Sequence, residues 1–131
     1  MQKKNVVGFK YAINGIIYAF KTEYKFKIHI FIAVAVIAAA IFFKTSYFEN
    51  LTLILVISLV FLAEMINSAI EKTVDLICID ILKKELNKNE YNIKAGLAKD
   101  IAAGAVLVSA INSVVIGLVI FFPKILEWLP R

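Results

Sequence analysis

A chain of 131 residues with 61% hydrophobic residues and a mean hydropathy of +0.82 is too apolar for an ordinary soluble domain. Its length allows one domain, which we expect to be a single integral membrane unit over residues 1–131. The net charge of +5 does not indicate a nucleic-acid partner, because the basic residues cluster beside apolar runs, where they attract anionic lipid.

An amphipathic helix is predicted over about residues 5–24, lying in the membrane surface. Apolar side chains recur there at helical spacing, while polar ones fall on the other side: Phe9, Ile13, Ile16, Ile17 and Phe20 against Lys10, Asn14 and Lys21. Glu23 follows, set among lysines, and either balances their charge or belongs to a functional site.

Three apolar segments are predicted to cross the membrane as helices, at about residues 26–44, 50–82 and 100–122. A bilayer core of roughly 30 Å needs about 20 helical residues, so the second segment is longer than one crossing requires. Its end therefore reaches the headgroups or the cytoplasm. Residues 87–92 form a polar loop in this prediction, and Pro123 ends the third span. The predicted fold class is all-α.

Lysines are concentrated before the first span and between the second and third spans. Since cytoplasmic loops carry the excess of basic residues, the N-terminus is predicted to be cytoplasmic and the C-terminus external. The expected location is the cell membrane, as a multi-pass protein.

Polar residues interrupt the second span on one side of the helix. They follow steps of three, one, three and four residues, which keeps them within one stripe: Glu64, Asn67, Ser68, Glu71 and Asp75. Two carboxylates in a low dielectric repel each other unless a divalent cation or a shared proton intervenes. Acids in spans are rare without a task, which favours function for Glu64 and Glu71. Asn67 and Ser68 fit hydrogen bonding between helices equally well.

Lys99 and Asp100 stand at the cytoplasmic start of the third span. They are either a solvated pair at a helix start or basic and acidic groups that meet phosphate where Glu23 and Glu71 would hold Mg²⁺. His29 has no companion His or Cys residue, so we expect an interfacial contact rather than a metal site.

The run Glu-Met-Ile-Asn-Ser-Ala-Ile-Glu from Glu64 to Glu71, with Asp75 one turn later, resembles the signature of the prokaryotic diacylglycerol kinase family. Ala98-Lys99-Asp100, followed by residues 105–107, resembles the second signature of that family. The resemblance extends over nearly the whole chain. It implies a homotrimeric lipid kinase that uses ATP and Mg²⁺, with each site formed at a subunit interface.

The resemblance also implies a role for each site residue. Glu64 would be the general base that takes the proton of the lipid hydroxyl, and Glu23 and Glu71 would be the metal ligands. Contacts to the nucleotide would come from Asn67, Glu71, Asp75, Lys99 and Asp100. Phosphoryl transfer depends mainly on positioning and charge neutralisation, which such a set provides.

Two features of the chain bear on the lipid substrate. His29 stands where Gram-negative members carry a second acid, and the segment from Leu76 to Ala98 is longer than theirs. Residues 92–100 are similar to the Gram-positive branch, whose members resemble undecaprenol kinases. We therefore expect the polyisoprenoid alcohol undecaprenol as substrate, with diacylglycerol as the alternative.

Two non-enzymatic interpretations remain. In the first, the protein is an ion or proton pathway, and the carboxylates relay cations. A continuous pathway needs polar groups on both sides of the membrane, whereas residues 51–62, in the external half of the helix, have almost none. The chain would be a structural membrane subunit in the second, and Glu64→Gln and Glu71→Gln would then leave its function intact.

Overall fold

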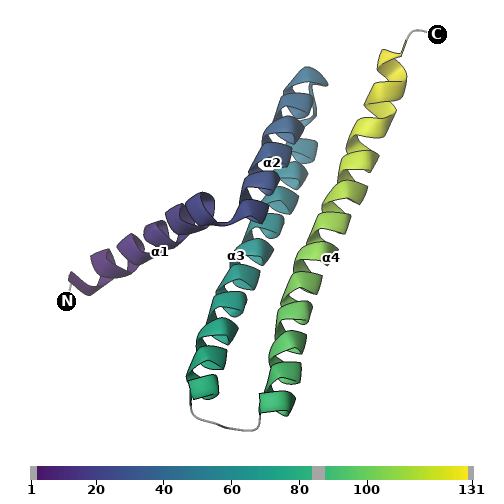
Figure 1. Cartoon of the computed structure of the whole chain (residues 1–131). Helices are drawn as coiled ribbons and strands as arrows, with labels where there is room; N and C mark the ends of the chain where they lie inside the picture. The colour runs from purple at the N-terminus through teal and green to yellow at the C-terminus, as the bar shows by residue number, and fades with distance from the viewer. Residues whose placement is uncertain (1–2, 84–87, 130–131) are drawn as a thin grey trace.

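The computed structural model describes residues 3–83 and 88–129 (Figure 1). The described part holds four helices: α1 (Lys3–Thr22), α2 (Tyr24–Phe42), α3 (Tyr47–Lys83) and α4 (Lys88–Trp128). Three of them have the length and apolar composition to cross a membrane in the described ranges, over Tyr24–Phe42, Tyr47–Ile79 and Ile93–Trp128. The prediction of an all-α chain with three candidate spans is confirmed.

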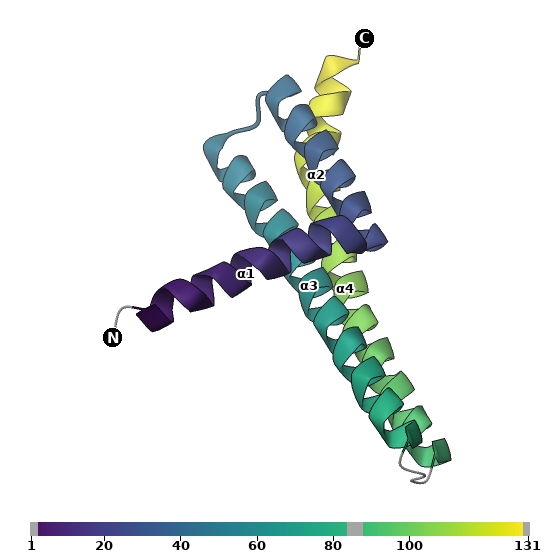
Figure 2. The same cartoon turned by 60° about the vertical axis from the view of Figure 1, so that its left-hand side comes forward.

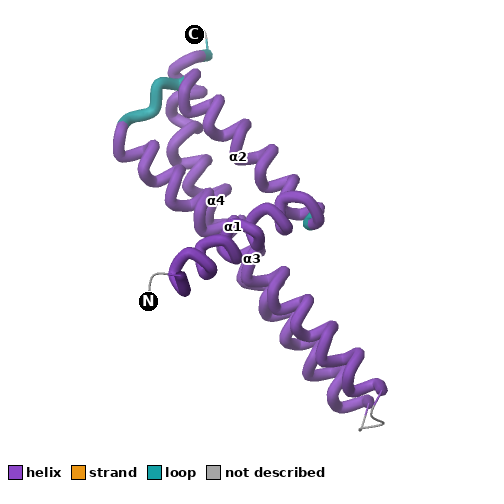
Figure 3. Tube along the Cα trace, turned by 90° about the vertical axis from the view of Figure 1, so that its left-hand side faces the viewer, coloured by secondary structure: helices purple, strands orange, loops and turns teal. Residues whose placement is uncertain are grey.

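The helices α3 and α4 form a long antiparallel pair, and α2 packs beside the half of α3 that follows the α2–α3 connection (Figure 1). Helix α1 leaves this bundle at a steep angle, as the turned view shows (Figure 2). Beyond the level of α1, α3 and α4 continue alone as a two-helix hairpin (Figure 3). The α1–α2 junction therefore meets α3 near its middle, where the polar stripe lies.

A break at Glu23 separates α1 from α2. Its backbone is extended, with φ −86° and ψ 113°, and Tyr24 already belongs to α2. The expected boundaries, a helix to residue 24 and a span from residue 26, therefore lie a little too late. This one extended residue sets the angle between the two helices.

The start of α3 is fixed by a reciprocal pair of side-chain caps. The Ser46 amide donates to Glu49 Oε2 at 2.6 Å, and the Glu49 amide donates to Ser46 Oγ at 3.3 Å. This capping box satisfies amides that have no partner within the helix, and it places the first residue of α3 at Tyr47, earlier than the predicted 50.

The predicted loop at residues 87–92 is wrong where the structure describes it. Lys88 to Asn92 are the first residues of α4, whereas Asn87 lies outside the described residues. The segment contains neither Gly nor Pro, and its Lys and Glu residues favour a helix, so the long α4 extends through it. Polarity alone did not distinguish a loop from a solvated helix.

Pro123 does not end the third span as predicted, because α4 continues to Trp128. Proline removes only one backbone donor, and membrane helices tolerate that loss where packing holds both sides. Here Lys124 Nζ lies 3.2 Å from Glu49 Oε2, and the rings of Trp128 and Phe42 are 6.0 Å apart. These contacts tie the last turns of α4 to α2 and α3.

A small apolar core joins α2, α3 and α4 at the same end of the bundle. Its buried members are Ala40, Leu53 and Ile120. This core holds one end of the bundle together. The polar stripe lies farther along α3, near the level at which α1 turns away from α2 and α3.

Candidate active site

Three polar side chains in the middle of α3 are buried: Glu64 and Asn67 are each 1% exposed, and Ser68 is 7% exposed. Within the part of the chain that the structure describes, Glu64 Oε2 and Asn67 Oδ1 have no hydrogen-bond partner. A buried polar atom without a partner costs about 1–3 kcal/mol. Folded proteins keep such atoms rarely, and a ligand site is one of the reasons for doing so.

Glu71, one turn beyond Asn67, connects this buried part to the surface. Asn67 Nδ2 donates to Glu71 Oε1 at 3.0 Å, and Lys25 Nζ lies 3.7 Å from the same oxygen. The spacing of four residues places the amide above the carboxylate on α3. Glu71 is therefore held from its own helix and from the start of α2.

Glu23 is held in a similar way from the opposite direction. Lys72 Nζ lies 2.5 Å from Glu23 Oε1, and the same ammonium lies 5.4 Å from the centre of the Tyr18 ring. The two ion pairs run in opposite senses: a lysine of α2 pairs with a carboxylate of α3, and a lysine of α3 pairs with the carboxylate at the α1–α2 break. Together they place both carboxylates, the predicted metal ligands, where the α1–α2 junction contacts α3.

Asp75 and Lys99 form the second part of the predicted site. Lys99 Nζ donates to Asp75 Oδ1 at 2.5 Å, which joins α3 to α4. Asp100 is exposed and makes no hydrogen bond or ion pair to the other described residues. The structure thus gathers Glu23, Asn67 and Glu71 around the α1–α2 junction and places the Asp75–Lys99 pair one turn farther along α3.

The carboxylates of Glu23 and Glu71 could hold a divalent metal ion together with ligands from a substrate. Among residues 3–83 and 88–129, no group of three or more His, Cys, Asp or Glu side chains is arranged to hold a metal. Mg²⁺ is commonly held by one or two carboxylates together with substrate phosphates, and it prefers oxygen ligands. Glu23 and Glu71 match that pattern, and the unpartnered Oδ1 of Asn67 adds an amide oxygen.

His29 is half-buried and lines a cavity of about 230 Å³ between α2, α3 and α4. Most of the other lining residues are apolar, including Phe61, whose ring packs 5.0 Å from that of Phe26. His29 therefore lies within the bundle and makes no hydrogen bond to another described residue.

Sequence reasoning did not single out Lys25, Lys72 or Tyr18 as site residues. Lys72 and Glu23 are 49 positions apart, so their contact depends on the angle between α1 and α2. A lysine directly after Glu71 is a local signal, but it does not identify its partner.

Comparison with known proteins adds independent information. The family model "Prokaryotic diacylglycerol kinase" matches residues 10–121. A diacylglycerol kinase of Synechocystis sp. is 39% identical over 122 residues, which are 93% of this chain and 65% of that protein. An undecaprenol kinase of Bacillus subtilis is 38% identical over 118 residues, which are 90% of this chain and 88% of that protein. No solved structure matches the chain.

The matched region contains the polar stripe of α3, the Glu23 break and the Asp75–Lys99 pair. The chain spans about two thirds of the Synechocystis protein and most of the Bacillus one. The chain therefore belongs to the prokaryotic diacylglycerol kinase family, whose members are membrane lipid kinases.

Proposed function

We propose that this member of a lipid kinase family transfers the γ-phosphoryl group of ATP to the hydroxyl of undecaprenol, with Mg²⁺ as cofactor. One observation carries the proposal: a buried carboxylate, Glu64, with an unpartnered oxygen, stands one turn from the Asn67–Glu71 pair. The Glu64 carboxylate can accept the proton that an attacking alcohol must lose. The Asn67–Glu71 pair can bind a metal-bound polyphosphate.

Each residue has a defined task in this proposal. Glu64 accepts the proton of the lipid hydroxyl as that oxygen attacks the γ-phosphorus, and ADP leaves. Asn67 orients the phosphates, and Glu23 and Glu71 hold Mg²⁺, which when bound neutralises phosphate charge. Asp75, Lys99 and Asp100 line the nucleotide side of the site. Because the chemistry is mostly positioning, the protein needs no covalent nucleophile.

Undecaprenol is preferred to diacylglycerol because the undecaprenol kinase of Bacillus subtilis aligns with this chain over most of both proteins. Diacylglycerol is the alternative substrate, because the Synechocystis relative is named as a diacylglycerol kinase. Both substrates present one hydroxyl at headgroup depth. They differ in the chain behind it.

A side-by-side kinase assay tests this preference. Purified protein in mixed micelles is supplied with Mg²⁺, ATP and either undecaprenol or diacylglycerol, and initial rates are measured over a range of lipid fractions. We expect kcat/KM to favour undecaprenol by at least about tenfold, which corresponds to about 1.4 kcal/mol of transition-state binding. A preference for diacylglycerol would assign the chain to the alternative activity.

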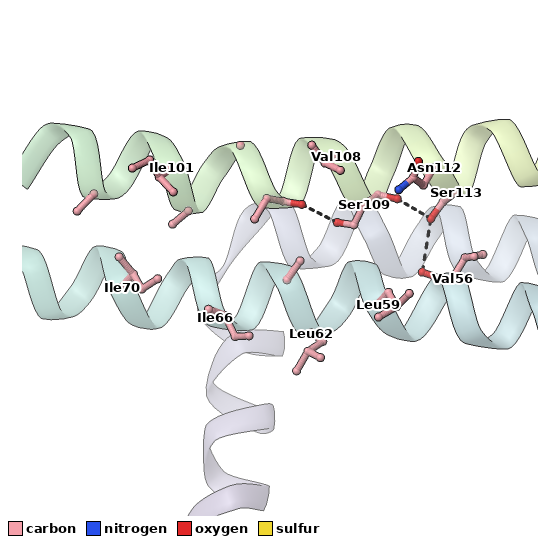
Figure 4. A pocket seen from close by; sticks show the side chains of 15 residues that line it. Val56, Leu59, Leu62, Ile66, Ile70, Ile101, Val108, Ser109, Asn112 and Ser113 are labelled. Atoms are coloured by element: carbon pink, nitrogen blue, oxygen red, sulfur yellow. Dashed lines mark hydrogen bonds between the residues drawn. The ribbon is translucent and has the colours of Figure 1, made fainter.

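We propose that the chain is a homotrimer with sites at subunit interfaces, and one feature of α4 supports self-association. Asn112 lies within the candidate span Ile93–Trp128 and is exposed in the single chain. It lines an apolar groove of about 710 Å³ between α3 and α4, beside Ser109 and Ser113 (Figure 4). An amide that faces hydrocarbon lacks hydrogen-bond partners, and a second copy packed on this groove would supply them.

Asn112→Val should therefore weaken self-association. Hydrogen bonds between membrane helices contribute about 0.6–2 kcal/mol, so we expect the dissociation constant to rise about threefold to thirtyfold per lost bond. Energy transfer between labelled chains, followed as lipid dilutes the protein, measures this change. Ser58→Ala is the matched control, since the exposed Ser58 hydroxyl already donates to Ile54 O. Equal association of Asn112→Val and wild type would contradict the proposed contact.

We propose that the N-terminus is cytoplasmic and the C-terminus external, with α1 lying in the surface of the cell membrane. Lysines are concentrated in the two segments assigned to the cytoplasm, the one before the first span and the one between the second and third spans. Large apolar side chains of α1 are exposed in the single chain, including Phe9 and Phe20 at 71% and 54%. A membrane surface would cover them, while Lys10 and Lys21 reach the headgroups.

A further inference from the structure

The crossed ion pairs at the α1–α2 junction occupy the same carboxylates that the proposed function assigns to Mg²⁺. Lys72 pairs with Glu23 and Lys25 pairs with Glu71, while Asn67 donates to the second carboxylate. Each ammonium lies against Oε1 of its carboxylate, at 2.5 Å in the Lys72–Glu23 pair and 3.7 Å in the Lys25–Glu71 pair. A metal ion bound to the same carboxylates would compete with the lysines for them.

We propose that Lys25 and Lys72 exchange partners during each catalytic cycle. In the metal-free state they neutralise Glu71 and Glu23, and with metal and nucleotide bound they turn to the polyphosphate of ATP. The inference rests on the proposed function and adds two phosphate-binding residues to the reaction.

The burial of the four side chains supports the exchange. In the first pair the Lys72 side chain is 48% exposed and that of Glu23 is 20% exposed. In the second pair the values are 60% for Lys25 and 34% for Glu71. In both pairs the lysine is the outer partner, so it can swing toward solvent while the carboxylate keeps its place. Exposed ion pairs contribute little to stability, so they are easily exchanged.

The balance of charge gives the exchange its direction. The two carboxylates and the two lysines are neutral together, and a divalent ion held by the carboxylates would supply the charge of both lysines. The ammonium groups would then be repelled by the metal and attracted by the phosphate oxygens of the nucleotide. Lysine suits this task because its charge sits on a long flexible stem.

Tyr18 keeps one of these lysines at the site. Its ring centre lies 5.4 Å from Lys72 Nζ, within the range of a cation–π contact, and the side chain of Tyr18 is 53% exposed. The ring holds the ammonium from the α1 side independently of Glu23. Lys72 can therefore leave the carboxylate without leaving the junction.

The test measures metal binding and nucleotide binding separately on Lys72→Met. Binding of Mn²⁺ without nucleotide is followed by its paramagnetic resonance, on the full-length protein in nanodiscs. We expect the Mn²⁺ affinity to rise about threefold to tenfold because a competing cation is gone, and the KM for ATP to rise by a similar factor because a phosphate ligand is lost. If Lys72 had only a structural role, its replacement would not strengthen Mn²⁺ binding while it weakens ATP binding.

Three further variants make the result decisive. Lys72→Arg keeps the charge and should keep both constants within about twofold of wild type, and Lys25→Met should repeat the opposed shifts at Glu71. Lys27→Met removes the same charge from α2, where its exposed side chain has no ion pair to another described residue, and should change neither constant more than about twofold.

Two outcomes would overturn the exchange. If Glu23→Gln weakens Mn²⁺ binding but Lys72→Met leaves it unchanged, the lysine does not compete with the metal, and the proposed kinase function stands. If Glu23→Gln and Glu71→Gln both leave Mn²⁺ binding unchanged, the metal assignment fails and the exchange fails with it.

Discussion

Glu64→Gln should lower kcat by about a thousandfold while ATP binding stays within about twofold of wild type. Glutamine has nearly the same shape, so it can fill the buried position in α3, but it cannot accept the proton of the attacking hydroxyl. The Glu64 side chain is 1% exposed and its Oε2 has no partner among the described residues, so no hydrogen bond within the described chain competes for that oxygen. Initial rates at saturating ATP and lipid, together with equilibrium binding of a non-hydrolysable ATP analogue, measure the two quantities.

A matched control for this variant lies on the same stripe. Ser68 is also buried, at 7% exposure, but has no place in the proposed chemistry. Ser68→Ala is expected to keep kcat within about threefold of wild type, as removal of a hydroxyl without a catalytic role should. If Glu64→Gln retained more than about a tenth of the wild-type kcat, Glu64 would not be the base.

Glu71→Gln is expected to lower kcat/KM for ATP by about a hundredfold or more, and to raise the Mg²⁺ concentration needed for half-maximal rate. The substitution removes one of two proposed metal-holding carboxylates and also the acceptor that Asn67 and Lys25 share. Rates measured across a Mg²⁺ titration at fixed ATP separate loss of metal from loss of the fold. If the variant followed the wild-type Mg²⁺ curve, Glu71 would not be a metal ligand.

Glu49→Gln is the matched control for Glu71→Gln. Glu49 lies on the same helix but at the opposite end, where it caps α3 and pairs with Lys124. Glutamine can still accept the Ser46 amide in the capping box, so Glu49→Gln removes only the charge that faces Lys124 and should leave the Mg²⁺ dependence unchanged.

The sequence predicted the helices and the stripe because both follow local periodicity. Apolar runs of sufficient length predict spans, and the spacing from Glu64 to Asp75 keeps those side chains on one stripe of any helix. Single-residue rules did less well. Pro123 was expected to end the last helix, but contacts of Lys124 and Trp128 with distant residues carry α4 beyond it.

The contacts between helices were beyond the reach of periodicity. The contact of Glu23 with Lys72, rather than with the lysines beside it in the sequence, depends on the extended backbone at Glu23, which turns α1 away from α2. Resemblance to a family placed Asp75 and Lys99 in one site, whereas spacing alone said nothing of their distance. The packing of α4 against α3 brings Lys99 Nζ to 2.5 Å from Asp75 Oδ1.

The most direct test of the central claim is to identify the lipid product. The protein in micelles is incubated with ATP, Mg²⁺ and undecaprenol, or with diacylglycerol in a parallel sample, and the extracted lipid is examined by mass spectrometry while ADP is measured in the same sample. Wild type should yield undecaprenyl phosphate and ADP in equal amounts, and Glu64→Gln almost no product. If neither undecaprenol nor diacylglycerol gained phosphate while the protein remained folded, the proposed kinase activity of this chain would be wrong.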